Sequence, residues 1–375
     1  MLSNRVVSIV VLLLAIVVSL IAGREFLSLY EREPVVPGPG VTKVARLSDY
    51  FPKIKDTVAD TDVFFLEGKQ PGGTVVIFGG VHSVETAGMM TAVLLVENAV
   101  VKTGRLIIVP HSNESGFSSN EPSEGYPNRI VIKTAWGSRW FRFGHRLTNP
   151  VHQWPDPEIY VHYPSGDLQA DFEVRNLDRA FPGRPDGTFT EKLAYALTEL
   201  VRQEHATMTL DLHEARPMNP IVNCIIAPQA AAEIAAMAVM DLGAQGIKIR
   251  LEPSPAKLRG MSHRELGEPT KTLPILMESA SPALDKLHGR ADQALILVGN
   301  DDFFKKADAR RLLYAPPYSK DGYPLEERVG RHTTATAVLI QLLSELHPDK
   351  KVEVENIPAY KAIKEKGIGS FLLKP

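Results

Sequence analysis

Residues 74–98 read TVVIFGGVHSVETAGMMTAVLLVEN and indicate the fold class. Thr74–Phe78 is a short run of β-branched and aromatic residues, which is typical of a buried strand. Gly79 and Gly80 end this run, and Thr86–Asn98 is rich in the Ala, Met and Leu that favour a helix. The stretch therefore predicts a strand that leads directly into a helix.

The same alternation continues along the chain. Strands are expected at Arg105–Val109, Thr207–Leu212, Ile221–Ala227, Ile247–Leu251 and Leu273–Met277, and helices at Glu191–Glu204, Ala230–Leu242, about 286–298 and 326–346. Short apolar strands alternating with helices predict an α/β fold with a largely parallel or mixed sheet covered on both faces. Ligands of such sheets bind at the carboxyl ends of the strands. Pro110–Thr188 breaks the alternation, and an irregular insert of this length usually carries function.

Composition excludes several classes of site and partner. The 375 residues hold 42 Lys and Arg against 44 Asp and Glu, a net charge of −2, which gives no positive field for nucleic acid. The single cysteine, Cys224, rules out an intramolecular disulfide and any metal site built from several cysteines. A metal site in this chain must therefore use His, Asp and Glu.

The N-terminal segment Val6–Gly23 is an almost uninterrupted apolar run between Arg5 and Arg24. Its length meets the lower limit for crossing a bilayer and predicts a membrane anchor, with a cleaved signal peptide as the alternative. A buried helix of a soluble domain fits poorly because no polar face is visible. In the first two cases the rest of the chain lies outside the cytoplasm, periplasmic or extracellular, and is secreted if the segment is cleaved.

Two pairs of His and Glu follow predicted strands and have the spacing of a metal ligand pair. His82 and Glu85 follow the strand at Thr74–Phe78 and are three residues apart, so in a first helical turn they share a face and can bind one cation. His111 and Glu114 have the same spacing but lie in a loop with no helix after it. We interpret this second pair as a chance match of a short motif.

Two further strand ends carry chemically suitable residues. His213 follows an apolar strand, and Asp211 lies two residues before it on the same face, which suits a third metal ligand supported by a carboxylate. The alternative is a histidine bonded within the core. Glu278 ends the strand at Leu273–Met277, where a partly desolvated carboxylate suits a general base for hydrolysis. The alternative there is a capping or ion-paired glutamate.

The insert contributes arginines and aromatics. RNLDRAFPG at residues 175–183 offers an arginine that could clamp a carboxylate or stabilise an oxyanion, although exposed loop arginines are commoner. Seven aromatic and basic residues of the insert could form a substrate lip, with buried loop packing as the alternative: Trp136, Arg139, Trp140, Phe141, Arg142, Phe143 and Trp154.

Four of these motifs together resemble one enzyme family. GGVHSVE at 79–85, NLDRAFPG at 176–183, DLH at 211–213 and Glu278 resemble the zinc-dependent succinylglutamate desuccinylase/aspartoacylase family, a branch of the zinc carboxypeptidase superfamily. The segment PHSNESGF at 110–117 also resembles a strand-end segment of that family. The resemblance covers about residues 70–300.

The resemblance implies a fold and a metal site. It implies three α/β/α layers with a central mixed sheet of about eight strands, preceded here by the membrane-anchor helix. It implies one zinc ion per chain, held by His82, Glu85 and His213, with Glu278 as the catalytic base.

On the substrate side the resemblance is less complete. It implies that Arg179 contacts the substrate or transition state, with Asn176, Arg175 and Asp178 beside it. The family usually has Asn where this chain has Asp178, and an ionised Asp there would repel a substrate carboxylate or neutralise the arginine. The family's second arginine falls on Asp171, so that Arg175 is the nearest candidate. The loop between His82 and Glu85 also lacks the family's frequent Gly-Asn.

The sequence thus predicts a zinc-dependent hydrolase that deacylates an N-acyl amino acid or related compound by metal-activated water. The alternatives are a zinc carboxypeptidase or amidase acting on envelope peptides, and a non-catalytic envelope binding module on the same scaffold. The expected partners are a small-molecule or peptide substrate and, through the N-terminal segment, the membrane. The expected division is an anchor or signal at 1–24, a spacer at 25–60, the zinc hydrolase domain at 61–347 and a C-terminal tail at 348–375.

Overall fold

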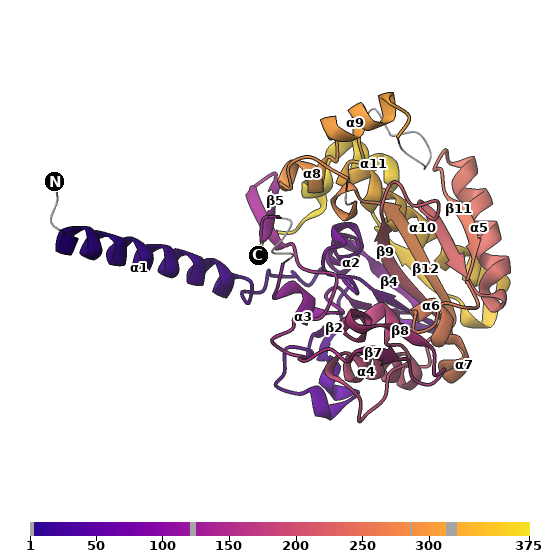
Figure 1. Cartoon of the computed structure of the whole chain (residues 1–375). Helices are drawn as coiled ribbons and strands as arrows, with labels where there is room; N and C mark the ends of the chain where they lie inside the picture. The colour runs from indigo at the N-terminus through magenta and orange to yellow at the C-terminus, as the bar shows by residue number, and fades with distance from the viewer. Residues whose placement is uncertain (1–3, 121–124, 286, 313–320) are drawn as a thin grey trace.

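A mixed sheet forms the centre of the domain, in the order β1-β2-β4-β3-β9-β12-β10-β11, with β13 paired to β4. The structure is a computed structural model that describes residues 4–120, 125–285, 287–312 and 321–375, and nine strands of this described part form the sheet (Figure 1). They are β1 (Lys43–Arg46), β2 (Asp62–Glu67), β3 (Gln70–Phe78), β4 (Val100–Val109), β9 (Met208–Ala215), β10 (Cys224–Ala227), β11 (Arg250–Pro253), β12 (Leu273–Ala280) and β13 (Glu353–Glu355). The predicted mixed sheet of about eight strands is confirmed.

Helices cover both faces of the sheet. The longer ones are α2 (Thr86–Asn98), α4 (Phe189–Gln203), α5 (Ala232–Ala244) and α10 (Leu325–Leu346), and the shorter ones are α3 (Glu114–Phe117), α6 (Ser262–Glu265), α7 (Gly267–Thr270), α8 (Gln293–Leu297), α9 (Asp302–Ala309) and α11 (Tyr360–Lys366). The apolar residues of α2, α5 and α10 share one core cluster with one face of the strands. Those of α4 pack in a second cluster on the other face. The predicted three-layer α/β/α fold is therefore confirmed.

Local sequence explains where α4 begins. The Thr188 side chain accepts a hydrogen bond from the Glu191 backbone N–H at 3.2 Å, and the Glu191 carboxylate accepts one from the Thr188 N–H at 2.8 Å. This reciprocal cap satisfies two backbone donors that a helix start leaves without partners. Leu193, Leu197 and Leu200 then recur at helical spacing and are buried against the sheet.

The helix expected at about 286–298 is shorter than predicted. Its described part is α8, Gln293–Leu297, and residue 286 lies outside the described residues. The Asp292 side chain accepts a hydrogen bond from the Leu295 N–H at 3.0 Å, so that the helix is capped there and does not extend back to earlier residues.

The insert at 110–188 is less irregular than the sequence suggests. It contains α3 and two antiparallel hairpins, one formed by β5 (Arg129–Thr134) and β6 (Gly137–Arg142), the other by β7 (Ile159–Val161) and β8 (Leu168–Ala170). Phe141 and Phe143 are buried in a core cluster, which is the packing role considered as the alternative to a substrate lip.

The N-terminal helix α1 (Asn4–Ser28) extends away from the domain, and none of its residues is buried (Figure 1). Its 25 residues give a length of about 37 Å at 1.5 Å per residue, enough to cross a hydrocarbon core of about 30 Å. By length and composition α1 can therefore serve as a membrane anchor or a signal sequence.

The segments predicted as spacer and tail are part of the folded domain. Within 25–60, β1 pairs antiparallel with β2, and Leu29 and Leu47 are buried. Within 348–375, β13 pairs antiparallel with β4, and the Leu373 N–H donates to Glu97 at 2.7 Å. The folded domain therefore begins before residue 61 and continues beyond residue 347.

A buried ion-pair network joins the segment after α1 to the domain. The Glu33 carboxylate contacts the His111 ring at 2.9 Å and pairs with the Arg142 guanidinium, which also pairs with Glu114 at 2.7 Å. Burial alone would raise the pKa of Glu33, but the charges of His111 and Arg142 lower it well below the ordinary range of a carboxyl. The network fixes the start of the domain close to the end of α1.

We expect Glu33→Ala to lower the free energy of unfolding of the domain by about 3–5 kcal/mol, because it leaves buried charge without its partner. Chemical denaturation followed by tryptophan fluorescence measures this. The matched control is Glu31→Ala, since the Glu31 side chain is 67% exposed although it lies 2.7 Å from Arg129; it should cost at most about 1 kcal/mol. Equal costs for the two variants would contradict the network's role.

The same variant has an expected pH dependence. Because the pKa of Glu33 is depressed in the folded state, its stabilisation is complete above the unfolded value of about 4.3 and is lost as the pH falls from there towards the folded value. The difference between wild type and Glu33→Ala should therefore shrink in acid. A difference that grows in acid would contradict the assigned sign.

Candidate functional site

His82 and Glu85 lie in the turn between β3 and α2. Gly80 has φ +62°, and a Cβ there would lie 2.8 Å from the Phe117 ring, so that this turn requires glycine. The Glu85 N–H donates to the His82 carbonyl at 3.0 Å, and Glu85 is the residue before α2. The pair thus precedes the helix instead of lying in its first turn as predicted. The side chains still meet, with His82 Nδ1 2.7 Å from Glu85 Oε1.

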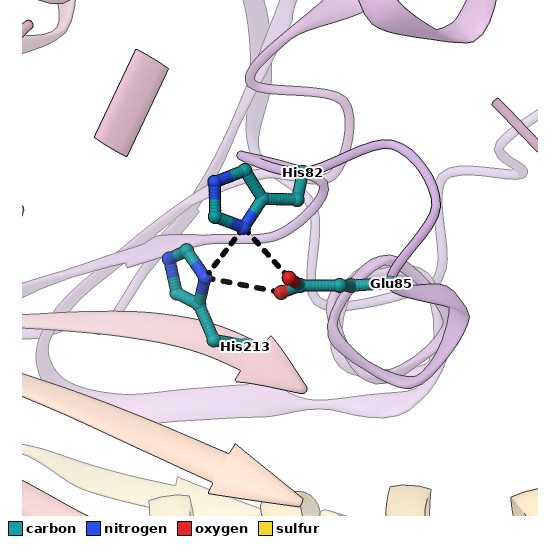
Figure 2. Close-up of side chains that lie close together, drawn as sticks. All are labelled: His82, Glu85 and His213. Carbon is teal, nitrogen blue, oxygen red and sulfur yellow. Dashed lines mark hydrogen bonds and ion pairs between the residues drawn. The ribbon is translucent and has the colours of Figure 1, made fainter. Parts of the chain in front are cut away.

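His213 reaches the pair from β9. A Cβ on Gly88 would lie 2.1 Å from the Leu212 carbonyl oxygen, so glycine at this position lets α2 approach β9 closely. His213 Nδ1 lies 3.0 Å from Glu85 Oε2 and 3.1 Å from His82 Nδ1. Figure 2 shows the three side chains pointing toward one another.

The outer nitrogen of each imidazole lies next to an oxygen, in a hydrogen bond for His82 and in an ion pair for His213. His82 Nε2 lies 2.9 Å from Asn176 Oδ1, and His213 Nε2 lies 2.9 Å from Asp211 Oδ1. Asn176 Oδ1 also accepts from the Asp178 N–H at 3.1 Å, which confirms it as an acceptor. With protons on both Nε2 atoms, loss of the Nδ1 protons to a metal ion would leave both Nδ1 atoms free to ligate it, the arrangement that metal-ligating histidines show.

The three side chains fit a metal ion. Two imidazoles and one carboxylate are among the ligands that zinc prefers, and a tetrahedral site with bonds of 2.0–2.1 Å separates its ligand atoms by about 3.3 Å. The facing atoms of His82, Glu85 and His213 are 2.7 to 3.1 Å apart, so a small adjustment would admit the ion. The group can hold a metal. A second group, formed by Asp178 and Asp211 with His213, shares that histidine and lies around its outer side.

The charged groups of the site shift one another's pKa values. Burial alone would raise the pKa of Glu85, but His82 and His213 hold it well below its ordinary value. Burial alone would lower the pKa of His213, but the carboxylates of Asp211 and Glu85 raise it well above its ordinary value. Glu85 is therefore a carboxylate at neutral pH, as a metal ligand must be.

Glu278 lies beside the ligands on the neighbouring strand. β12 runs parallel to β9, and Glu278 is in register with His213. Its Oε2 atom is buried and has no hydrogen-bond partner in the described part of the chain. Burial, and then the charge of Glu85, raise the pKa of Glu278 well above its ordinary value. An unpaired buried carboxylate with a raised pKa is typical of an acid–base group.

Residues 71–278 match the model of the succinylglutamate desuccinylase/aspartoacylase catalytic domain. The match spans more than half of the chain and includes the two histidines and two glutamates described above. The chain belongs to the succinylglutamate desuccinylase/aspartoacylase family. The named activities of this family hydrolyse amide bonds. No curated protein matches the sequence.

Solved structures of low sequence identity are also similar. A succinylglutamate desuccinylase from Silicibacter sp. TM1040 is 19% identical, with a TM-score of 0.36, over 58% of this chain and 53% of that one. An aspartoacylase family protein from Mesorhizobium loti is 23% identical, with a TM-score of 0.37, over 59% and 56%. The cell shape determinant protein Csd4 from Helicobacter pylori is 12% identical, with a TM-score of 0.44, over 80% and 58%. The chain thus covers little more than half of each of these solved chains.

The arginines predicted for the substrate have partners in the protein. Arg175 makes a two-pronged ion pair with Asp156 at 2.7 and 2.9 Å. Arg179 donates to the Asp178 backbone carbonyl at 2.6 Å and to its carboxylate at 3.2 Å. Burial alone would raise the pKa of Asp178, but His213 and Arg179 lower it, so that it stays ionised. The replacement of the family's Asn by Asp178 therefore neutralises Arg179 in part.

Asn176, also predicted on the substrate side, forms hydrogen bonds through both its amide oxygen and its amide nitrogen. Its oxygen faces His82 and the Asp178 N–H, and its Nδ2 donates to Glu173 at 2.6 Å. These contacts orient the His82 ring.

Arg146 was missed by the sequence reasoning. Its NH1 lies 3.0 Å from Glu85 Oε1, and 42% of its side chain is exposed. It follows β6 within the insert, and no motif marks it; only the presence of a long insert pointed to this region. Arg146 therefore places a half-exposed cation beside His82, Glu85 and His213.

A polar layer behind the ligands was also missed. His332 Nε2 lies 3.0 Å from the His213 carbonyl oxygen, and Arg328 pairs with the buried Glu214 at 2.6 Å. Arg328 and His332 are one helical turn apart on α10, and both are buried. The sequence signal that could have found this layer is a pair of polar residues four positions apart on a buried helix face.

His111 and Glu114 lie apart from the ligand group. His111 contacts Glu33, and Glu114 pairs with Arg142 and, at 3.1 Å, with Arg32. Neither residue belongs to a possible metal group in the described part of the chain. Their contacts agree with the interpretation of this pair as a chance match.

Asp211→Asn should weaken Zn2+ binding about 10–100-fold, because the neutral amide holds the His213 ring less firmly and makes it less basic. Competition with a chromophoric chelator measures the affinity. Asp241→Asn on the exposed side of α5 makes the same chemical change away from the site and should leave the affinity unchanged. Unchanged affinity in Asp211→Asn would show that Asp211 does not support a ligand.

Proposed function

We propose that the chain is a zinc-dependent amide hydrolase that deacylates an N-acyl amino acid or a related compound. The observation that carries this proposal is the convergence of two imidazole Nδ1 atoms and one carboxylate beside Glu278, whose Oε2 atom has no hydrogen bond within the described part of the chain. The family to which the chain belongs supports it.

His82, Glu85 and His213 would hold one zinc ion per chain. When bound, zinc supplies Lewis-acid chemistry, since it polarises a carbonyl and brings the pKa of water down to about 7. Three protein ligands are the number typical of catalytic zinc sites, which keep one position open.

Glu278 is the proposed proton carrier. Its buried Oε2 has no hydrogen bond within the described residues, so it can accept a proton from the attacking water. Its raised pKa allows the protonated form to persist until the proton passes to the leaving amine. The parallel register with His213 keeps this oxygen at the level of the ligands.

Arg146 is the proposed contact for the oxyanion that develops on the scissile carbonyl. It has solvent access and lies next to Glu85, whereas Arg175 is held by Asp156. Arg179 is partly neutralised by Asp178 and would contribute a weaker contact to the substrate. Because a strong pair of arginines is missing, small acidic acyl amino acids are less suitable than neutral ones or short peptides.

We also propose that α1 anchors the enzyme in a membrane, with the catalytic domain outside the cytoplasm. The length of α1 and its lack of buried residues support the anchor.

Glu278→Gln should retain zinc and lose about 10²–10⁴-fold in turnover, because the amide cannot take the proton. The substrate comes from a screen of the zinc-loaded wild type over N-acyl amino acids and short peptides, and metal analysis gives the zinc content. Glu252→Gln on β11 is the matched control and should keep its activity. Full turnover by Glu278→Gln, or a zinc-loaded wild type that cleaves nothing in the screen, would refute the assignment.

Arg146→Gln should lower turnover about 10²–10³-fold, as expected when one oxyanion contact is lost. Its stability should change little, because Arg146 is half-exposed and Glu85 keeps its contacts with His82, His213 and the Glu214 N–H. Arg175→Gln is the comparison, since it breaks the pair with Asp156 and should lower stability more than turnover. The reverse pattern in these two variants would assign the substrate contact to Arg175.

A further inference from the structure

The outer face of the β5–β6 hairpin has an unusual composition for a surface. It carries Arg129, Val131 and Lys133 from β5, Trp140 from β6 and Trp136 from the turn between them; we call these five residues the hairpin face. We propose that the hairpin face rests in the lipid headgroup region of the bilayer that α1 enters. This inference rests on the proposed anchor.

The hairpin has one buried and one open side. Ile130, Ile132 and Phe141 point inward and are buried in the core, together with Ile363 of α11. The alternate residues point outward, so that Val131 remains 42% exposed and Trp136 37% exposed. The Arg129 guanidinium lies 4.0 Å above the Trp140 ring, which keeps the indole on the outer side.

The hairpin is attached to the end of α1. Arg129 NH2 donates to the Ser28 carbonyl at 2.7 Å and pairs with Glu31 at 2.7 Å. The Asn128 amide donates to the Glu25 carbonyl at 3.3 Å. Figure 1 shows β5 beside the last turns of α1. The apolar run of α1 ends at Gly23, so these contacts lie where the helix would leave the bilayer.

The connection between α1 and the domain cannot act as a flexible tether. Leu29 is buried, and Glu33 is fixed in the core by Arg142 and His111. Only four residues, 29–32, therefore separate the end of α1 from a buried ion pair. The hairpin must stay close to the membrane surface whenever α1 is inserted.

The chemistry of the hairpin face suits the headgroup region. Tryptophan concentrates there because its ring is apolar and its N–H is polar, and lysine and arginine extend their charges to the phosphates. Phe26 and Tyr30, near the end of α1, are 67% and 48% exposed and add aromatic surface at the same level. A protein partner could also use aromatic residues and arginine, but the attachment to α1 favours lipid.

Tryptophan fluorescence tests the inference, because the chain has three tryptophans. Trp154 is 72% exposed on another loop, so Trp154→Phe should fold normally and leave only Trp136 and Trp140 as reporters. The full chain carrying this change is reconstituted into phosphatidylcholine nanodiscs, with acyl chains either unmodified or brominated near the headgroup. We expect loss of most of the fluorescence in the brominated lipid. Equal fluorescence in the two lipids would overturn the inference.

A second measurement separates the two proposals. The same protein in vesicles is washed with alkaline carbonate and sedimented, which retains only inserted chains in the pellet. Protein in the pellet with unquenched tryptophans would leave the anchor standing and refute the hairpin face. Protein in the supernatant would refute the anchor, and the hairpin inference with it. Binding of a soluble protein to the hairpin face in nanodiscs, with quenching absent, would assign the face to a protein partner.

Discussion

The carboxylate of Glu85 holds the site together. One oxygen contacts His82 at 2.7 Å and Arg146 at 3.0 Å, while the other contacts His213 at 3.0 Å and the Glu214 N–H at 2.8 Å. These donors come from three separate parts of the chain, namely the β3–α2 turn, the insert and β9. A buried carboxylate is costly unless donors surround it, so folding must bring these three parts together to satisfy Glu85.

The two histidines that contact Glu85 also have polar partners on their outer sides. On its outer side His213 forms an ion pair with Asp211, whose other oxygen accepts from the Ser262 hydroxyl. His82 is bonded on its outer side by Asn176. These outer contacts do not involve the Nδ1 atoms, so they can persist when a metal ion replaces the inner ones. The protein therefore holds both rings in the ligating orientation before the ion binds.

Sequence patterns could predict those features of the fold and the site that are determined by neighbouring residues or by the direction of the strands. The turn from β3 into α2 is encoded within residues 74–98, and α2 has the bounds predicted for it. His213 and Glu278 could be placed together because parallel strands end at one edge of a sheet. Arg146 could not be found this way, because its position depends on how the hairpins of the insert pack. The position of Arg175 in the sequence also could not show that this arginine would form an ion pair with Asp156.

The insert also connects the segment after α1 to the site. Arg142, at the end of β6, is held by Glu33 on one side and Glu114 on the other. Two residues later the Gly144 N–H donates to the Ser83 carbonyl at 3.1 Å, between the two ligands of the β3–α2 turn. Arg146 follows immediately, so the segment that presents it is fixed both to the residues after α1 and to the ligand turn. The residues that link α1 to the domain therefore contribute to the structure of the site, because they fix the segment that carries Arg146.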